Sequence, residues 1–324
     1  MSRALRILIS LALLALVLYF ADWHSVGAVL RTVELKWVLA GFGLLLLDRV
    51  ILNSKWQVLL AARGVVVGFW KLLRVQLAAN FLGSFLPSTV GVDFVRVAAL
   101  VRGGHSSAAV IGATLVDRAS MVLGTFLFAS VTILVLSQVA IPAEMSRIVL
   151  LLTVIGVLIC ATALLPGVRR WVRLSLLPRL PEKVRGAIHS VADASLAFRH
   201  EYRALFWAAL TSVVTLVVRI LFAKCVALAC GVDVKFLDLL LVIPILWIIV
   251  MLPITIGNIG VQEAGYVAVM TLIGVGPAVA VSMSIIEHVV ARAVSLPGAL
   301  FIGDVTAKAT TPDAAAPTAN APRR

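Results

Sequence analysis

Acidic and basic side chains occur inside stretches of this chain that are otherwise apolar. Five acids and six bases lie there: Asp48, Arg49, Asp93, Arg96, Asp117, Arg118, Arg219, Lys224, Glu263, Glu287 and Arg292. A charge at the centre of a membrane helix costs roughly 2.5–3.5 kcal/mol on the insertion scale, so such residues are usually paired or functional. We therefore expect these charges to pair around a polar interior, with an excess positive charge left for an anionic guest.

Two interrupted segments share one short motif. Leu86-Pro87-Ser88-Thr89-Val90-Gly91 and Leu252-Pro253-Ile254-Thr255-Ile256-Gly257 both read Leu-Pro-x-Thr, then a β-branched residue, then Gly, and they start 166 residues apart. Proline lacks an N–H and tends to stop a helix, whereas glycine permits the positive φ that lets a chain reverse. Broken helices at corresponding places in two halves indicate a transporter built as an inverted repeat.

The two breaks also predict an anion site. Backbone groups freed at a break cannot face lipid, so they must be buried in protein or line a wet cavity. We expect each outgoing half-helix to begin just after Gly91 or Gly257. Its free N–H groups and the positive end of its dipole would then lie at the hairpin tip. Two such tips meeting halfway through the membrane would suit a lipid phosphate.

The composition is that of a polytopic membrane protein. Of 324 residues, 62% are hydrophobic and 13% are charged, and the mean hydropathy is +1.10. Soluble domains are about half apolar and about a quarter charged. This excludes a cytoplasmic globular enzyme, a disordered chain and a disulfide-stapled module. The net charge of +13 fits the positive-inside rule better than nucleic-acid binding. The three cysteines show no metal-site spacing.

The elements that must position these residues are predicted to be helices throughout. We expect an all-α architecture of six full spans and two opposed re-entrant hairpins, or alternatively eight spans. The spans are predicted at 5–21, 37–60, 107–136, 148–165, 204–230 and 278–302, and the broken hairpins at 72–101 and 236–273. Residues 22–36 are expected to form an outer loop.

The expected membrane domain covers residues 1–303, with halves at 1–145 and 146–303. A basic amphipathic segment at 167–203 is predicted to lie on the cytoplasmic surface, because bases mark that side. The N- and C-termini are expected on the same side. The tail at 304–324, rich in Ala, Thr and Pro, is predicted to be disordered.

The segment Asn80–Arg96 resembles the first signature of the flippase-like integral membrane family, which includes the transmembrane region of lysylphosphatidylglycerol synthase. The segment Leu252–Glu263 resembles its second signature, and the likeness extends over about residues 5–302. The resemblance implies an all-helical lipid-translocating domain with opposed re-entrant helices. Its implied substrates are aminoacylated phosphatidylglycerol or polyprenyl- and dolichyl-linked sugars.

Three positions depart from the family pattern, which bears on the identity of the substrate. Val92 and Asn258 stand where the family usually has the second glycine of a pair, and Gln262 stands where a base is common. Few residues follow the last predicted span, so we do not expect the soluble aminoacyl-transferase domain that makes lysylphosphatidylglycerol.

The candidate substrate-binding residues come from the two motifs and from the spans that follow them. They are Asn80, Pro87, Thr89, Gly91, Asp93, Arg96, Arg118, Pro253, Thr255, Gly257, Asn258, Gly260, Glu263 and Arg292. A candidate proton relay consists of Asp117, Glu287 and His288.

Structural roles compete with these assignments. Asp93 has an equal alternative as a helix N-terminal acid paired with Arg96 one turn on. Structural ion pairing is likewise an alternative for the arginines Arg118, Arg219 and Arg292. We interpret Asp48, Arg49 and Lys224 as residues near the membrane–water interface, whose side chains extend toward water.

The leading hypothesis is translocation of an anionic lipid or polyprenyl-phosphate-linked lipid across the bacterial inner membrane. Its phosphate would be held by half-helix N-termini, Arg96 and Arg118, while Asp93 and Glu263 pair with bases or contact a cationic headgroup. No ATP-binding motif is present, and no cofactor or metal is expected. The expected partners are the lipid substrate and the bilayer but not nucleic acid; a homo-oligomer or a biosynthetic complex is left open.

Two other functions compete with this one. An intramembrane glycosyltransferase needs a carboxylate base in an outer loop. The 22–36 segment offers only Asp22 and Glu34 for that role. The other alternative is a non-transporting accessory subunit of a lipid, hopanoid or glycolipid biosynthesis complex, against which the many intramembrane charges count.

Overall fold

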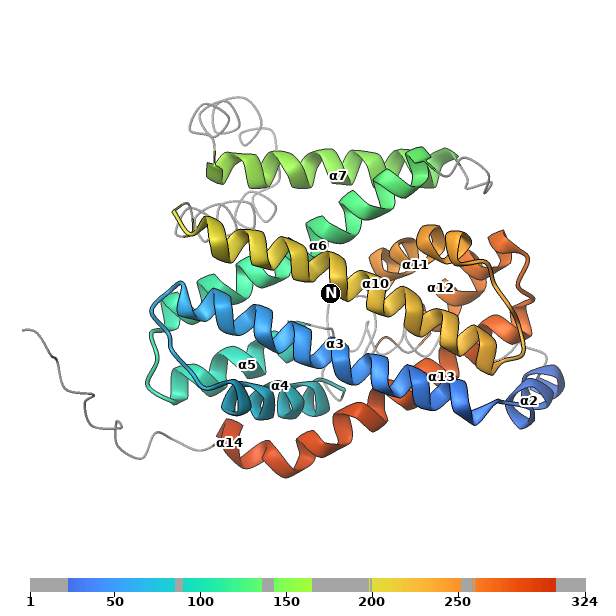
Figure 1. The fold of residues 1–324 in the computed structure, drawn as a ribbon, viewed down its shortest axis with the longest axis horizontal. Coiled ribbons are helices and arrows are strands. Elements are labelled where there is room, and N and C mark those ends of the chain that lie inside the picture. Colours follow the sequence, from blue (N-terminus) through green and yellow to red (C-terminus); the bar gives the residue numbers. More distant parts are fainter. Residues whose placement is uncertain are drawn as a thin grey trace, which may run out of the picture.

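The computed structural model of the chain describes residues 23–84, 90–135, 143–164, 198, 200–251, 258 and 260–306. Within these ranges every regular element is a helix (Figure 1). The expected span at 5–21, the motif residues 85–89 and 252–257, most of the basic segment 167–203 and the tail beyond residue 306 lie outside the described residues.

The helices follow the predicted segments closely. In chain order they are α2 (Trp23–Arg31), α3 (Leu35–Ala61), α4 (Phe69–Gly83), α5 (Val90–Arg102), α6 (Ser107–Val135), α7 (Ala143–Leu164), α10 (Tyr202–Ala229), α11 (Phe236–Met251), α12 (Val261–Met270), the 3-10 turn η3 (Thr271–Ile273), α13 (Pro277–Ser295), the 3-10 helix η4 (Leu296–Phe301) and α14 (Ile302–Thr306). Three segments of the described chain are long and apolar enough to cross a bilayer: Ser107–Val135, Tyr202–Ala229 and Pro277–Phe301.

Three local boundaries differ from the predictions. Trp23–Arg31 is helical where a loop was expected. Helix α5 begins at Val90 rather than after Gly91, so Gly91 lies in its first turn. Helix α12 begins after Gly260 rather than after Gly257. The last difference has a local cause, because Gly260 has a φ of 87°, which is incompatible with a right-handed helix and ends the break.

A long–short–short–long order of helices occurs twice along the chain. The first set is α3, α4, α5 and α6, and the second is α10, α11, α12 and α13. The two leading helices, α3 and α10, pack against each other along their length (Figure 1). Gly41 permits this approach, since a Cβ atom there would lie 3.1 Å from the ring of Phe222 on α10.

Each half also packs against the closing helix of the other half. Helix α11 contacts α6, and α4 contacts α13 and its continuation η4. Gly298 is required for the second contact, because a Cβ atom there would lie 2.1 Å from the carbonyl oxygen of Leu77 on α4. The short helices are therefore held between the halves, where their ends can border a common interior.

Two apolar clusters support this interior. One contains Tyr266 and is built mainly from α10, α11, α12 and α13. The other contains Trp56 and is built from the second half of α3 with α4, α5 and α6. Trp56 and Tyr266 are the two largest fully buried side chains among the described residues. Both lie beside charged residues, so packing and ion pairing are coupled here.

Candidate functional site

Asp117 on α6 is the centre of a buried ion network in the first half. Its Oδ1 atom lies 3.1 Å from Nζ of Lys55 on α3, and its Oδ2 atom lies 3.2 Å from Nη2 of Arg96 on α5. Arg96 also lies 3.4 Å from Asp93, whose other oxygen is 3.6 Å from Arg118. Two acids and three bases from three helices are therefore joined in one network.

Further contacts hold the two innermost bases in place. The guanidinium of Arg96 stacks 4.0 Å from the ring centroid of Trp56, in cation–π geometry. Nζ of Lys55, which is fully buried, also donates to the Ser212 hydroxyl at 2.9 Å and to the Asp117 carbonyl at 3.1 Å. These partners hold the side chain of Arg96 in place at the wall of the interior.

A second ion pair joins the two halves. Oδ1 of Asp48 on α3 accepts a hydrogen bond from Nε of Arg219 on α10 at 3.2 Å, while Arg49 lies 3.7 Å from the other oxygen. Arg219 also stacks on Trp247, 4.1 Å from its ring centroid. Asp48 is fully buried, so its interpretation as an interface residue is wrong. Its carboxylate points into the protein because a buried arginine from the other half neutralises it there.

Lys224 has its partners in the turn that follows its own helix. Its ammonium donates to the carboxylate of Asp233 and to the carbonyl of Val234, in the turn that follows α10. Asp233 is exposed. Lys224 therefore pairs near the end of its helix, with a partner on the protein surface.

In the second half, Glu263 and Glu287 each have a protein partner. Oε1 of Glu263 lies 2.9 Å from Nε2 of His288, and its Oε2 accepts the N–H of Gly260 at 2.6 Å. The hydroxyl of Tyr266 donates to Glu287 on α13. These contacts join the start of α12 to the middle of α13, where the predicted relay residues Glu287 and His288 are neighbours in the sequence. Asp117, the third predicted member, belongs to the separate network on α6.

The turn before α12 explains one departure from the family pattern. Asn258 has a φ of 62°, a left-handed conformation that glycine adopts freely and that asparagine tolerates better than most residues. Its carbonyl accepts the N–H of Gln262 at 3.0 Å. Asparagine at a position where the family usually has glycine thus preserves the backbone turn and adds an amide side chain.

Two cavities lie between the halves. The first, which we name the Arg292 cavity, has a volume of about 180 Å³; the second, the Arg118 cavity, has about 220 Å³. Both are far larger than the roughly 10–15 Å³ that one water molecule needs. Five residues from both halves line the two cavities in common: Arg49, Asn80, Val92, Trp247 and Asn258. The ends of α4 and α5 and the turn before α12 therefore converge on one interior.

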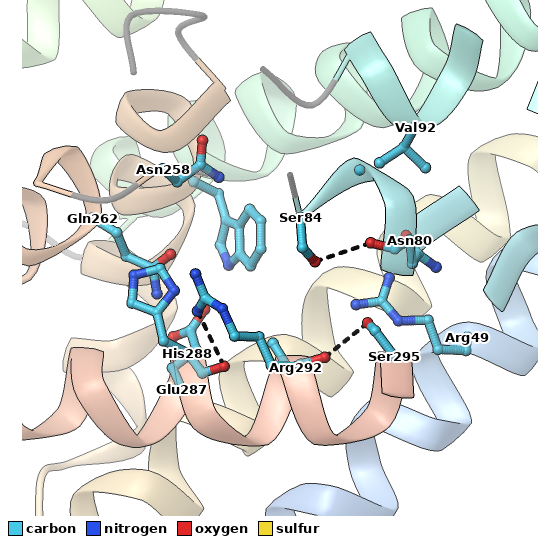
Figure 2. A pocket seen from close by; sticks show the side chains of 13 residues that line it. Arg49, Asn80, Ser84, Val92, Asn258, Gln262, Glu287, His288, Arg292 and Ser295 are labelled. Carbon is cyan, nitrogen blue, oxygen red and sulfur yellow. Dashed lines mark hydrogen bonds between the residues drawn. The ribbon is translucent and has the colours of Figure 1, made fainter. Parts of the chain in front are cut away.

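Figure 2 shows how side chains enter the Arg292 cavity. Arg49 comes from α3, Asn80 and Ser84 from the end of α4, and Arg292 from α13. The guanidinium of Arg292 donates to the carbonyl of His288 at 3.4 Å. Among the described residues it has no carboxylate within ion-pair distance, in contrast to Arg96, Arg118 and Arg219.

The structure gathers most of the predicted site residues that it describes. Those that line a cavity are Asn80, Asp93, Arg96, Asp117, Arg118, Asn258, Glu287, His288 and Arg292. Glu263 and Gly260 lie directly behind them through the His288 contact. Gly91 lies in the first turn of α5, next to Val92 of the lining. Pro87, Thr89, Pro253, Thr255 and Gly257 lie outside the described residues.

Sequence reasoning did not include Arg49 or Gln262 among the candidate site residues, although both line the Arg292 cavity, and it missed four partners of the predicted charges. Lys55, Trp56, Trp247 and Tyr266 are the partners of the predicted charges. A signal for Lys55 was present, because it follows Asp48 by seven residues and so lies on the same face of a helix. The aromatic residues carried no such signal, since any apolar span contains residues of their kind.

The fold and this interior define a helical membrane protein with charged cavities between two halves. A family model described as the lysylphosphatidylglycerol synthase TM region matches residues 3–298. The chain belongs to this family, which indicates a function related to membrane lipids. No curated protein and no solved structure matches the chain.

Proposed function

We propose that the protein translocates an anionic lipid or polyprenyl-phosphate-linked lipid across the inner membrane. In this proposal α4–α5 and α11–α12 are re-entrant hairpins of an inverted repeat that enter from opposite faces. Their lengths support this, because α4, α5, α11 and α12 have 15, 13, 16 and 10 residues. At 1.5 Å per residue, such helices reach about 15–24 Å, less than a hydrocarbon core of about 30 Å.

The observation that carries the proposal is the charge of the shared interior. Five arginines line the two cavities: Arg49, Arg96, Arg118, Arg219 and Arg292. The carboxylates of the described lining are Asp93, Asp117 and Glu287. An excess of guanidinium groups around a cavity inside a membrane protein favours a phosphate, which each guanidinium can bind with two parallel hydrogen bonds.

The contacts favour other arginines as phosphate ligands than Arg96 and Arg118, which the sequence suggested. Arg96 and Arg219 are each held by a carboxylate and a tryptophan ring, so they shape the interior. Arg292 lacks a carboxylate partner within the described residues, and Arg49 shares Asp48 with Arg219. We therefore assign the phosphate chiefly to Arg49 and Arg292. Arg49 lines both cavities, so it can remain in contact while the phosphate passes between them.

Translocation is tested in vesicles of phosphatidylcholine that contain the protein and a trace of phosphatidylglycerol. One acyl chain of this phosphatidylglycerol carries a fluorophore that dithionite reduces. Dithionite bleaching of the outer leaflet then measures the rate at which label crosses. We expect Arg49→Gln and Arg292→Gln each to slow this rate about tenfold or more, since a hydrogen bond to a charged group contributes about 1.5–3 kcal/mol and 1.4 kcal/mol is a factor of about ten.

Arg147→Gln is the matched control. Arg147 lies on α7, is exposed, and pairs with Glu144 at 3.0 Å. Its replacement should leave the rate unchanged. A wild-type rate equal to that of protein-free vesicles would sink the translocation proposal. Sugar transfer from an added polyprenyl-phosphate sugar would instead favour the glycosyltransferase, and neither activity would favour an accessory subunit.

The pairs Glu263–His288 and Tyr266–Glu287 are proposed to couple proton movement to transport. They lie beside the Arg292 cavity and contain groups that can gain or lose a proton. A pH gradient across the same vesicles should then change the rate for the wild type. Replacement of His288 by Gln should remove that change while some passive movement continues.

A further inference from the structure

The lining of the Arg292 cavity contains hydrogen-bond donors that have no partner within the described chain. Nε of Arg49, Nδ2 of Asn80 and Nε2 of Gln262 are buried and unbonded, and the guanidinium of Arg292 lines the same space. Gln262 is only 6% exposed, so its amide is nearly buried. Buried polar groups are normally hydrogen-bonded, and a cluster of unpartnered donors indicates a missing acceptor.

Carboxylates are scarce at the same place. Glu287 is the one acid in the described lining of this cavity, and it already accepts the hydroxyl of Tyr266. Glu263, just behind, is occupied by His288 and by the N–H of Gly260. The motif residues 85–89 and 252–257, which lie outside the described ranges, contain no acid in the sequence. An ammonium group entering here would lie near two guanidinium groups and only one carboxylate of the described lining.

We propose that this cavity takes a lipid headgroup whose phosphate is its only charged group, and that it excludes aminoacylated headgroups such as that of lysylphosphatidylglycerol. The inference rests on the proposed function and names its substrate class. Two guanidinium groups and two amides supply donors to the phosphate oxygens. A lysyl group would place a second cation beside Arg49 and Arg292, where like charges repel.

The test measures binding in detergent micelles, where no translocation is needed. Short-chain phosphatidylglycerol and the matching lysylphosphatidylglycerol are titrated separately into the purified full chain by calorimetry. We expect phosphatidylglycerol to bind at least about tenfold more tightly, because the lysyl ammonium would lie beside the guanidinium groups of Arg49 and Arg292. Arg292→Gln should weaken phosphatidylglycerol binding by a similar factor, and Arg147→Gln should not.

Gln262→Glu tests the selectivity directly. It keeps the shape of the side chain and places a carboxylate in the cavity, so it should weaken phosphatidylglycerol binding and strengthen binding of the lysyl lipid. Gln262→Met is the matched control, because it removes the donor without adding charge. It should weaken phosphatidylglycerol binding and leave the affinity for the lysyl lipid low.

Several results would overturn the inference. Equal or tighter binding of lysylphosphatidylglycerol by the wild type would do so, as would an unchanged preference in Gln262→Glu. If inorganic phosphate alone bound as tightly as phosphatidylglycerol, the site would serve free phosphate and the lipid assignment would fall. Selective binding together with absent translocation would leave this inference standing and would reject the proposed function.

Discussion

Lys55 on α3 and Asp117 on α6 form an ion pair at 3.1 Å inside the membrane domain, with the lysine fully buried. They are 62 residues apart in the chain. The same ammonium also donates to Ser212 on α10, so one side chain ties together three helices from both halves. The charge network is thus part of what holds the interior in shape.

Replacing Lys55 by Met should destabilise the protein strongly. Asp117 would keep Arg96 but lose its second cation, and breaking a buried pair by removing one partner costs about 3–5 kcal/mol. The free energy of unfolding, measured in mixed micelles titrated with dodecyl sulfate, reports the loss. Lys36→Met is the control on the same helix, because Lys36 pairs with Glu34 at the exposed surface and its loss should cost at most about 1 kcal/mol. If the Lys55→Met and Lys36→Met variants lost the same free energy of unfolding, the buried Lys55–Asp117 pair would not form.

A new disulfide should join α3 to α10. A Cβ atom built on Gly41 would lie 3.8 Å from Cβ of Cys225, which falls within the range of about 3.5–4.5 Å found in disulfides. Gly41→Cys should therefore cross-link to the native Cys225 under mild oxidation, with a small shift of the Phe222 ring. Counting free thiols by maleimide labelling, followed by peptide mass mapping, identifies the bond.

Gly43→Cys provides the control for this cross-link. Gly43 lies on the same helix, but nothing lies within 4 Å of a Cβ atom there. It should keep its free thiol under conditions that oxidise the Gly41→Cys variant. If both variants retained their thiols, α3 and α10 would not pack with Gly41 facing Cys225.

Gly260→Ala should weaken both stability and transport. Gly260 has φ 87° and ψ −48°, a conformation that costs a side-chain-bearing residue about 1–3 kcal/mol. Its N–H also donates to Glu263, so distortion here would move the acid away from His288. Thermal unfolding in detergent should show a lower midpoint, and the vesicle assay should show a slower rate.

Gly112→Ala separates this effect from a general intolerance of alanine. Gly112 lies inside α6, has no unusual φ, and has open space where the methyl group of an alanine would lie. Because alanine favours a helix over glycine by roughly 0.5–1 kcal/mol, the variant should be as stable as the wild type or more so. If the Gly260→Ala variant were as stable as the Gly112→Ala variant, the turn at Gly260 would not be strained.

The membrane spans could be predicted from the sequence because a long apolar run is a local property of the chain. An apolar run of about twenty residues predicts a helix wherever it lies, and α3, α6 and α10 begin and end within a few residues of the predicted limits. The turn before α12 was harder to predict from the sequence. Its Leu-Pro-x-Thr-x-Gly motif marks a break, yet the positive φ that ends the break lies at Gly260, beyond the motif.

The pairing of charges was only partly accessible. Asp93 and Arg96 are one helical turn apart, so helical spacing predicts their contact, and the structure has it. The contacts Asp48–Arg219 and Lys55–Asp117 depend on which faces of distant helices meet. Sequence reasoning therefore placed Asp48 near an interface and did not include Lys55 at all.

What the sequence alone determined is that this chain is a helical membrane protein with two matching breaks and an excess of basic charge in its interior. These follow from composition, hydropathy and local motif chemistry. Only the tertiary structure decided which carboxylates the described arginines pair with, and that Arg49, Asn80 and Asn258 border one interior. The reason is physical: an ion pair forms wherever packing brings opposite charges together, and packing joins residues that the linear order of the chain keeps far apart.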